Sequence, residues 1–465
     1  MQLDEKKKAI FETMPIPKAI MTMAVPTVIS QLINLIYNIV DTFFIGQTGN
    51  SYMMAAVTVA FPLFIMTVAI SNLFGMGGGS LIARLCGKGE TENAKKVSAF
   101  SVYGSVIGAL AYSLLIGLLM EPILNLLGAS ENTLTFAKQY TLFTVVIGGI
   151  PTILSTSVAH LLRNVGHSKQ ASLGLSGGGI LNIILDPLFM FVLLPDGMEV
   201  LGAALATCIS NLIACLFLLG VLIRTSKTTV LGCSLRDFRS IDPKNRREVF
   251  SVGIPSALLP GLHDVSNFVL ISLMSRHGDL PLAAMGIVMK AERLPNAINI
   301  GICQAMLPIV AYNYASGNRE RMQKTIRLGR IYGLSICVVC VALFELFASP
   351  ITGIFLSAKG AGAAEALTTI GYAALFLRFR CLSSPVQFLN FHTSFCMQAM
   401  GDGRDTLIHA LFRDLVFYIP FMFLLNALFG AVGLVNGQLA GESCSAILAM
   451  ILLRRWIKKT GNPAK

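Results

Sequence analysis

The chain has 465 residues, of which 54% are hydrophobic and only 13% are charged, and its mean hydropathy is +0.70. Soluble globular proteins carry about 25% charged residues, so this composition excludes an ordinary soluble enzyme or a string of soluble domains. The 36 Lys and Arg exceed the 24 Asp and Glu by 12. In a soluble protein that excess would suggest a nucleic-acid partner, but here the position of the charges decides their meaning.

Apolar stretches recur along the whole chain, and each is long enough to cross the roughly 30 Å hydrocarbon layer as a helix. They predict an all-α polytopic membrane protein with twelve transmembrane helices. The predicted spans are residues 19–46, 53–83, 97–120, 139–162, 170–194, 200–223, 249–274, 282–313, 331–348, 366–398, 405–426 and 432–453.

The Lys and Arg residues outside these spans alternate between rich and poor connections. The two tails and every second connection hold 28 of them, whereas the intervening connections hold 3. Because basic residues are retained on the cytoplasmic side, both termini are predicted to be cytoplasmic. We therefore expect a multi-pass protein of the cell's inner (plasma) membrane that binds no nucleic acid, and the net charge is mainly a topology signal.

The second half of the chain echoes the first. Pro26 matches Pro255, Gly89 matches Gly317 and Gly202 matches Gly433, in the same order and at offsets between 228 and 235 residues. Six spans in each half give parallel repeats about an axis along the membrane normal. The predicted organisation is an N-terminal six-helix lobe (1–223), a basic cytoplasmic connection (224–248) and a C-terminal six-helix lobe (249–465). Such a pair of lobes suits alternating-access transport, although a symmetric scaffold would also show a repeat.

Carboxyl groups inside predicted spans are functional candidates, because a charge in hydrocarbon is costly. Asp41 lies in the first span, Asn182 and Asp186 lie one helical turn apart in the fifth, and Thr207 lies in the sixth. At about 1.5 Å per residue, all four sit at a similar depth below the outer surface. They therefore form a candidate cation-coupling set.

The chemistry of this set leaves two coupling ions open. Two carboxylates with amide and hydroxyl oxygens suit Na⁺, in which case the four residues would be its ligands. The same carboxyl pair could instead hold a proton, and a helix–helix hydrogen-bond cluster is the structural alternative. No GxxxxGK[ST] motif is present, so we expect an ion gradient, H⁺ or Na⁺, as the energy source and no cofactor.

Three further residues of the first span lie near this set in sequence. Pro26 removes one helical hydrogen bond and makes the span a candidate for bending. Asn34 and Tyr37 share a helical face with Asp41 and could line a substrate cavity or simply pack in the core.

The second lobe carries more charge. Asp264 and Glu292 are candidates for contact with substrate or protons, whereas the arginines in spans 10 and 11 are expected to be structural and to pair with acids. His263, beside Asp264, could join a proton relay or be a satisfied interior histidine.

Several short motifs carry a family resemblance. The runs Tyr37-Asn-Ile-Val-Asp41-Thr-Phe-Phe-Ile-Gly46, Ala83-Arg-Leu-Cys-Gly-Lys-Gly89, Leu162-Arg-Asn-Val-Gly166 and Asn182-Ile-Ile-Leu-Asp186-Pro187 resemble the multidrug and toxic compound extrusion (MATE) family. The resemblance spans nearly the whole chain and is strongest in the first half. Lys290-Ala-Glu292 looks closer to the bacterial MepA-type branch.

This resemblance implies two six-helix bundles that export organic, often cationic and amphipathic, compounds in exchange for Na⁺ or H⁺. It implies a cation site at Asp41, Asn182, Asp186 and Thr207, and bending of the first span at Pro26. The expected function is therefore a secondary active multidrug exporter that is not an enzyme, that works as a monomer in the lipid bilayer and that binds small organic cations or drugs.

Three other functions would each require a different sequence feature. A flippase for a lipid-linked oligosaccharide would need a basic cavity, for which Arg378, Arg380 and Arg413 are candidates. A membrane-embedded prenyl transferase would need clustered acidic metal-binding motifs, and a channel would need a filter sequence; the sequence contains neither.

Overall fold

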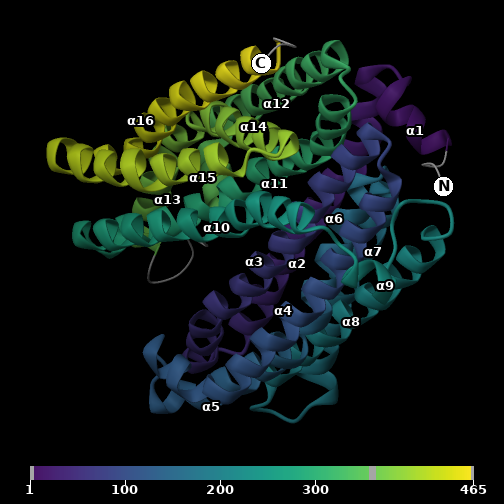
Figure 1. Ribbon diagram of the computed structural model, residues 1–465. Coiled ribbons are helices and arrows are strands. Elements are labelled where there is room, and N and C mark those ends of the chain that lie inside the picture. The colour runs from purple at the N-terminus through teal and green to yellow at the C-terminus, as the bar shows by residue number, and fades with distance from the viewer. Residues whose placement is uncertain (1–4, 355–362, 462–465) are drawn as a thin grey trace. The chain divides into compact units, whose positions relative to one another are not determined.

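The computed structural model describes residues 5–354 and 363–461, which form helices and, among these residues, no strand (Figure 1). The predicted all-α class is therefore confirmed. The helices from the first part of the chain are α1 (Glu5–Glu12), α2 (Ile16–Gln47), α3 (Ser51–Lys88), α4 (Thr91–Leu126), α5 (Glu131–Thr141), η1 (Leu142–Ile147), α6 (Gly149–Asn164), α7 (Ser168–Leu188), η2 (Phe189–Leu193), α8 (Glu199–Thr225) and α9 (Leu235–Arg239). Those that follow are α10 (Pro243–Met274), η3 (Ser275–His277), α11 (Asp279–Ala315), α12 (Arg319–Gly353), α13 (Ala363–Cys381), α14 (Ser384–Met400), α15 (Gly403–Leu411), η4 (Phe412–Tyr418) and α16 (Ile419–Gly461).

By length and composition, nine helices in the described ranges can cross a membrane. The number is ten if the bent pair Glu131–Ile147 and Gly149–Asn164, which turns by 43°, counts as one span. The chain is thus a multi-pass membrane protein. The longest of the nine, Gly403–Trp456, contains both of the last two predicted spans. Gly430 interrupts it with φ 60° and ψ −144°, a conformation that favours glycine. The count of twelve spans stays a prediction.

One predicted span is broken in the structure. We expected a single helix over 366–398, but α13 ends at Cys381 and α14 begins at Ser384. The cause is Pro385, because a proline has no N–H to donate to the carbonyl four residues earlier and therefore fits best in the first turn of a new helix. This proline was a visible sequence signal for the break.

The helices pack as two compact units. Within the described residues, the first unit runs to Ala257 and includes Leu307–Met322 and Ala399–Gly401, and the second contains the remainder. In the first unit, α3 packs closely on its neighbours because its face is built of glycine. A Cβ at Gly75 would lie 2.9 Å from Ser157 Cα, and one at Gly77 would lie 2.9 Å from Gly253 Cα. These glycines therefore allow the close helix packing that small residues permit in membrane proteins.

The short helix α1 docks within the first unit. Phe11 is buried and stacks on Tyr312 with ring centroids 5.2 Å apart. The Arg321 guanidinium donates to the backbone carbonyls of Ile10, Phe11 and Met14 at 3.0, 2.6 and 2.6 Å. Ile10 and Phe11 lie in the last turn of α1, whose carbonyls lack a partner within the helix, and Met14 lies just beyond it. Arg321, together with Asn313, which also donates to the Phe11 carbonyl, therefore caps the helix and holds it in place.

The second unit has its own apolar core. Side chains from α10, α11, α12, α13, η4 and α16 meet there, among them Leu270, Met285, Phe344, Phe376 and Tyr418. Tyr418 is almost fully buried and, with Asp414, comes from the π-helical segment η4. This segment therefore brings polar groups next to the apolar core.

Candidate functional site

The predicted cation-coupling residues of the first unit come from α2, α7 and α8. Asn182 and Asp186 lie one turn apart on α7, and the Asn182 side-chain amide donates to Asp186 Oδ1 at 3.0 Å. The same amide lies 3.3 Å from the hydroxyl oxygen of Thr207 on α8, to which it donates. Asn182, Asp186 and Thr207 are 2%, 0% and 7% exposed. The structure thus brings these three residues together in a buried cluster.

Asp41 on α2 completes the set. Its carboxyl group interacts electrostatically with that of Asp186, and neither group forms an ion pair within the described part of the chain. Three buried acceptor atoms have no hydrogen-bond partner among the described residues: Asp41 Oδ1, Asn182 Oδ1 and Asp186 Oδ2. Because an unsatisfied buried acceptor is costly, a bound cation or proton would stabilise this arrangement.

The donor set limits what kind of cation fits. The described residues contain no group of three or more His, Cys, Asp and Glu side chains that could hold a metal ion. The cluster offers two carboxyl groups, one amide oxygen and one hydroxyl, all hard oxygen ligands. It suits a proton or Na⁺ and lacks the nitrogen and sulfur ligands that zinc prefers.

Asn34 and Tyr37 lie on the face of α2 that meets α7. A Cβ added at Gly179 would lie 3.5 Å from the Tyr37 ring and 3.9 Å from Asn34 Oδ1, so this glycine lets the two helices approach. Tyr37 is within electrostatic range of Asp41 and Asp186. Pro26 lies nearer the N-terminus of α2, in the interior of a helix that runs unbroken from Ile16 to Gln47.

A second tyrosine joins this cluster and was not found from the sequence. Tyr140 on α5 is 8% exposed and interacts electrostatically with Asp41, Asp186 and Tyr37. It lies in the first turn of a predicted span, where a tyrosine ordinarily indicates the membrane–water interface. No local sequence pattern distinguishes that role from contact with the carboxyl pair.

In the second unit the predicted site residues lie in different surroundings. Glu292 on α11 is buried and accepts a hydrogen bond from Arg380 Nε at 2.8 Å, and Arg380 also donates to the Tyr418 hydroxyl at 3.1 Å. Glu292 therefore has a counter-ion. Asp264 on α10 is exposed and interacts with His263, Arg293 and Asp414.

The expectation that some second-lobe charges pair is confirmed. Arg413 and Glu442 form a buried ion pair with N–O distances of 2.6 to 3.0 Å. The exposed Arg378 approaches Glu345 at 3.9 Å. The three second-lobe arginines of spans 10 and 11 therefore each have an acidic partner.

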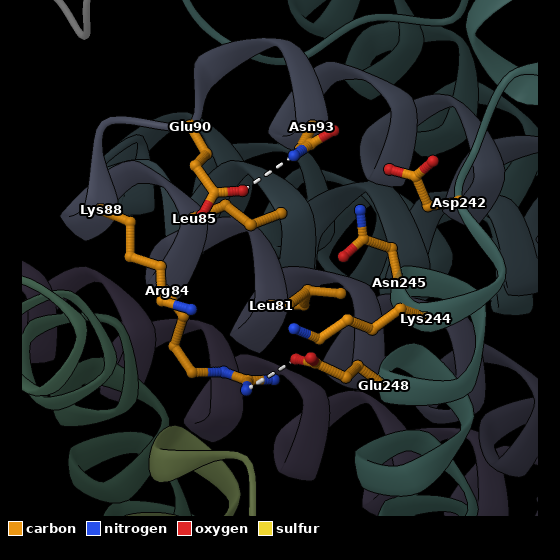
Figure 2. Close-up of a pocket in the computed structure, with 10 residues that line it drawn as sticks. All are labelled: Leu81, Arg84, Leu85, Lys88, Glu90, Asn93, Asp242, Lys244, Asn245 and Glu248. Carbon is orange, nitrogen blue, oxygen red and sulfur yellow. Dashed lines mark hydrogen bonds and ion pairs between the residues drawn. The ribbon is translucent and has the colours of Figure 1, made fainter.

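A pocket of about 260 Å³ lies elsewhere in the first unit, at the end of α3 (Figure 2). Figure 2 shows the Arg84 guanidinium reaching Glu248, with Nη1 to Oε2 at 3.1 Å. The pocket is lined by Leu81, Arg84, Leu85, Lys88, Glu90, Asn93, Asp242, Lys244, Asn245 and Glu248. Three basic and three acidic side chains balance in charge, and none of the residues predicted to bind ion or substrate lies in this pocket.

Comparisons with known proteins give a consistent result. The MatE family model matches residues 26–188 and 255–424, two segments that begin at the paired prolines Pro26 and Pro255. The chain is 31% identical to the multidrug export protein MepA of Staphylococcus saprophyticus, over 95% of this chain and 94% of that one. It is 30% identical to MepA of Staphylococcus aureus, again over 95% and 94%.

The fold also has close structural relatives. A multidrug resistance MATE family transporter of the MOP superfamily, solved in an outward-facing conformation, superposes with a TM-score of 0.91. The match covers 99% of this chain and 100% of that one at 24% sequence identity.

Proposed function

Because the chain belongs to the multidrug and toxic compound extrusion (MATE) family, we propose that it is a secondary active multidrug exporter. It exchanges H⁺ or Na⁺ for amphipathic, often cationic, organic compounds, which are the partners it binds. It acts by alternating access between two six-helix lobes, residues 1–223 and 249–465, joined by the basic connection 224–248. It is a carrier and not an enzyme, and it works as a monomer in the plasma membrane with both termini cytoplasmic.

The observation that carries this proposal is the oxygen cluster of the first unit. Asp41 and Asp186 are two neighbouring carboxyl groups without a counter-ion among the described residues, and three buried acceptors around them lack partners. A cation or proton bound between them removes a large local penalty, which is what makes its binding strong enough to drive a conformational change. Antiport follows if the ion and the drug favour different conformations, since that coupling is reciprocal.

Substrate contacts are proposed for one face of α2 and for two acids of the second unit. Asn34 and Tyr37 offer an amide and an aromatic ring beside the ion site, and an aromatic ring attracts organic cations. Asp264 is exposed and carries the negative charge that a cationic drug requires. Glu292 would contact substrate only if its bond to Arg380 opened, so it ranks behind Asp264. Pro26 is proposed as the bending point of α2.

The flippase alternative receives less support from the same contacts. An anionic lipid-linked substrate needs unpaired basic groups, yet Arg380 and Arg413 are bonded to Glu292 and Glu442. A buried arginine already paired with a carboxylate has little charge left for an anionic substrate. We therefore retain one proposed function.

The test is ethidium efflux from proteoliposomes under separately imposed Na⁺ and H⁺ gradients. We expect one gradient to drive efflux and Asp186→Asn to reduce it about 5- to 150-fold, because coupling free energies are typically about 1–3 kcal/mol. Asp196→Asn is the matched control, since it makes the same chemical change at an exposed turn residue. Efflux that depends on neither gradient, or that has the same rate in Asp186→Asn as in the wild type, would contradict the proposal.

A further inference from the structure

A second polar pair lies in the second unit, apart from the oxygen cluster of the first. Asp414 on η4 has a side chain that is 1% exposed, and its Oδ1 lies 3.3 Å from Nδ1 of His263 on α10. Ser266, three residues further along α10, donates its hydroxyl to the Asp414 backbone carbonyl at 3.0 Å. Two bonds thus hold η4 against α10 at this point, and one of them joins two titratable groups.

The other buried charges around Asp414 are already neutralised. Arg413 pairs with Glu442, and Arg380 pairs with Glu292. The second oxygen of Asp414, Oδ2, is buried and has no hydrogen-bond partner in the described ranges. A buried carboxylate needs a counter-charge. The charge of Arg413 acts on Asp414, and the His263 ring is the titratable group hydrogen-bonded to it.

Other titratable and charged groups act on the pair from the neighbouring elements. His409 on α15 and Arg413 on η4 act on Asp414, and Asp264 on α10 acts on both members of the pair. Arg293 on α11 acts on Asp264, and Glu442 on α16 is held by Arg413.

His409 is not an equivalent alternative to His263. Its Nδ1 contacts the Ser394 hydroxyl at 2.9 Å, and its Nε2 contacts Asn390 Oδ1 at 3.1 Å and the Ser445 hydroxyl at 3.0 Å. Both ring nitrogens are therefore occupied by uncharged partners in a fully buried site. The His263 side chain is 26% exposed, and its hydrogen bond among the described residues is made by Nδ1 alone. Its Nε2 is the nitrogen left to meet a proton from outside.

We propose that His263 and Asp414 form a second proton-binding site, which loads and releases one proton in each transport cycle. The Nδ1–H group of the neutral ring donates to Asp414, so an incoming proton binds the lone pair of Nε2 and no other bond breaks. The product is an imidazolium–carboxylate pair with no net charge, and loss of the proton leaves one buried negative charge. Imidazole suits this role, because it is the side chain whose ordinary charge change falls between pH 5 and 8.

Occupancy of the site bears on how η4 packs. The loaded pair holds η4 to α10 by a charge-assisted hydrogen bond, which is stronger than a neutral one. The unloaded pair leaves a buried anion that solvent would stabilise better. Loading thus favours the packing seen here, and unloading favours an arrangement in which Asp414 reaches water. The site's use in transport rests on the proposed function, whereas its proton chemistry does not.

The first experiment needs no substrate. ¹⁵N-histidine-labelled protein in micelles is recorded between pH 5 and 9, and the His263 signals are identified by their loss in His263→Gln. We expect the neutral ring to be the Nδ1–H tautomer and to gain a proton within this range, and Asp414→Asn to shift it toward the Nε2–H tautomer. An Nε2–H tautomer in the wild type, or no change in Asp414→Asn, would overturn the site. A merely structural histidine would respond in the same way but would leave the number of protons exchanged per substrate unchanged.

The second experiment counts protons. With an internal pH dye in proteoliposomes, His263→Gln should exchange about one H⁺ fewer per ethidium than the wild type, since each linked site contributes one proton. His277→Gln is the matched control, because that ring is hydrogen-bonded to Asn426 at 2.6 Å and is not part of the pair. An unchanged ratio in His263→Gln would refute the coupling role. If the wild type moves no ethidium, the proposed function fails while the tautomer measurement still decides the site.

Discussion

The Arg413–Glu442 ion pair offers a quantitative test of the second unit. Both side chains are 3% exposed, Arg413 Nη2 lies 2.6 Å from Glu442 Oε1, and Nε lies 3.0 Å from both oxygens. Unit charges about 4 Å apart interact by about 4 kcal/mol at an effective dielectric constant of 20. Removing one partner also strands the other charge in the interior, which typically costs about 3–5 kcal/mol. We therefore expect Glu442→Gln and Arg413→Met each to lower the free energy of unfolding by about 3–5 kcal/mol.

The double variant should behave differently. Replacing both residues, as Arg413→Met with Glu442→Leu, leaves neither member of the pair as a stranded charge, and well-packed apolar replacements of buried pairs are often nearly neutral. Asn390 would still donate to the backbone carbonyl of residue 442, a bond of 3.0 Å in this structure. The double variant should thus be more stable than either Glu442→Leu or Arg413→Met alone.

The assay is denaturant unfolding in mixed micelles, arranged as a double-mutant cycle. The matched control is Glu345→Gln, which breaks a 3.9 Å pair whose members are 51% and 40% exposed and should cost less than about 1 kcal/mol. If the decreases in the free energy of unfolding of the two single variants simply add in the double variant, Arg413 and Glu442 do not stabilise each other and the prediction is refuted.

Two further predictions concern packing in the first unit. Gly77→Ala should lower the free energy of unfolding by about 1–3 kcal/mol, because its Cβ would clash with the backbone of α10. The control is Gly177→Ala, where a Cβ meets nothing within 4 Å, and it should show no such loss in the same unfolding assay. In Arg321→Ala, α1 should detach more easily from the rest of the first unit, because three backbone carbonyls lose their hydrogen bond from Arg321. Each hydrogen bond from a charged donor contributes about 1.5–3 kcal/mol. Amide hydrogen exchange over residues 7–14 would then rise, and unchanged protection there would contradict the capping role.

Local geometry explains which parts of the first-unit site could be predicted from sequence. Asn182 and Asp186 are four residues apart on a helix, and that spacing alone places them on one face, where they form a hydrogen bond. Thr207 lies on a different helix at the same predicted depth, and the packing of α7 on α8 then brings it into contact with Asn182. Tyr140 was missed because depth alone does not tell which face of α5 meets the cluster.

Helix phase explains what could not be predicted in the second unit. Pairs such as Glu292–Arg380 join residues far apart in the chain, and their geometry depends on how whole helices are rotated. The π-helical turn of η4 adds to this, because a wider turn shifts the side chains that follow it relative to an α-helix. Asp414 and Tyr418 both lie within η4, so α-helical spacing gives no reliable face for either.

The two units treat buried charge in opposite ways, and this contrast bears on how each could bind an ion. In the first unit, Asp41 and Asp186 interact electrostatically, have unsatisfied oxygens and, among the described residues, form no ion pair. A cation or proton that enters this site would therefore interact with both carboxyl groups without having to displace a basic side chain. In the second unit arginines already neutralise Glu292 and Glu442, so a metal cation would have to displace a guanidinium held by short hydrogen bonds. A proton needs only a lone pair, and the His263 ring beside Asp414 supplies one without breaking an ion pair. Dependence on Na⁺ would accordingly be a property of the first unit alone, whereas a proton could act at both.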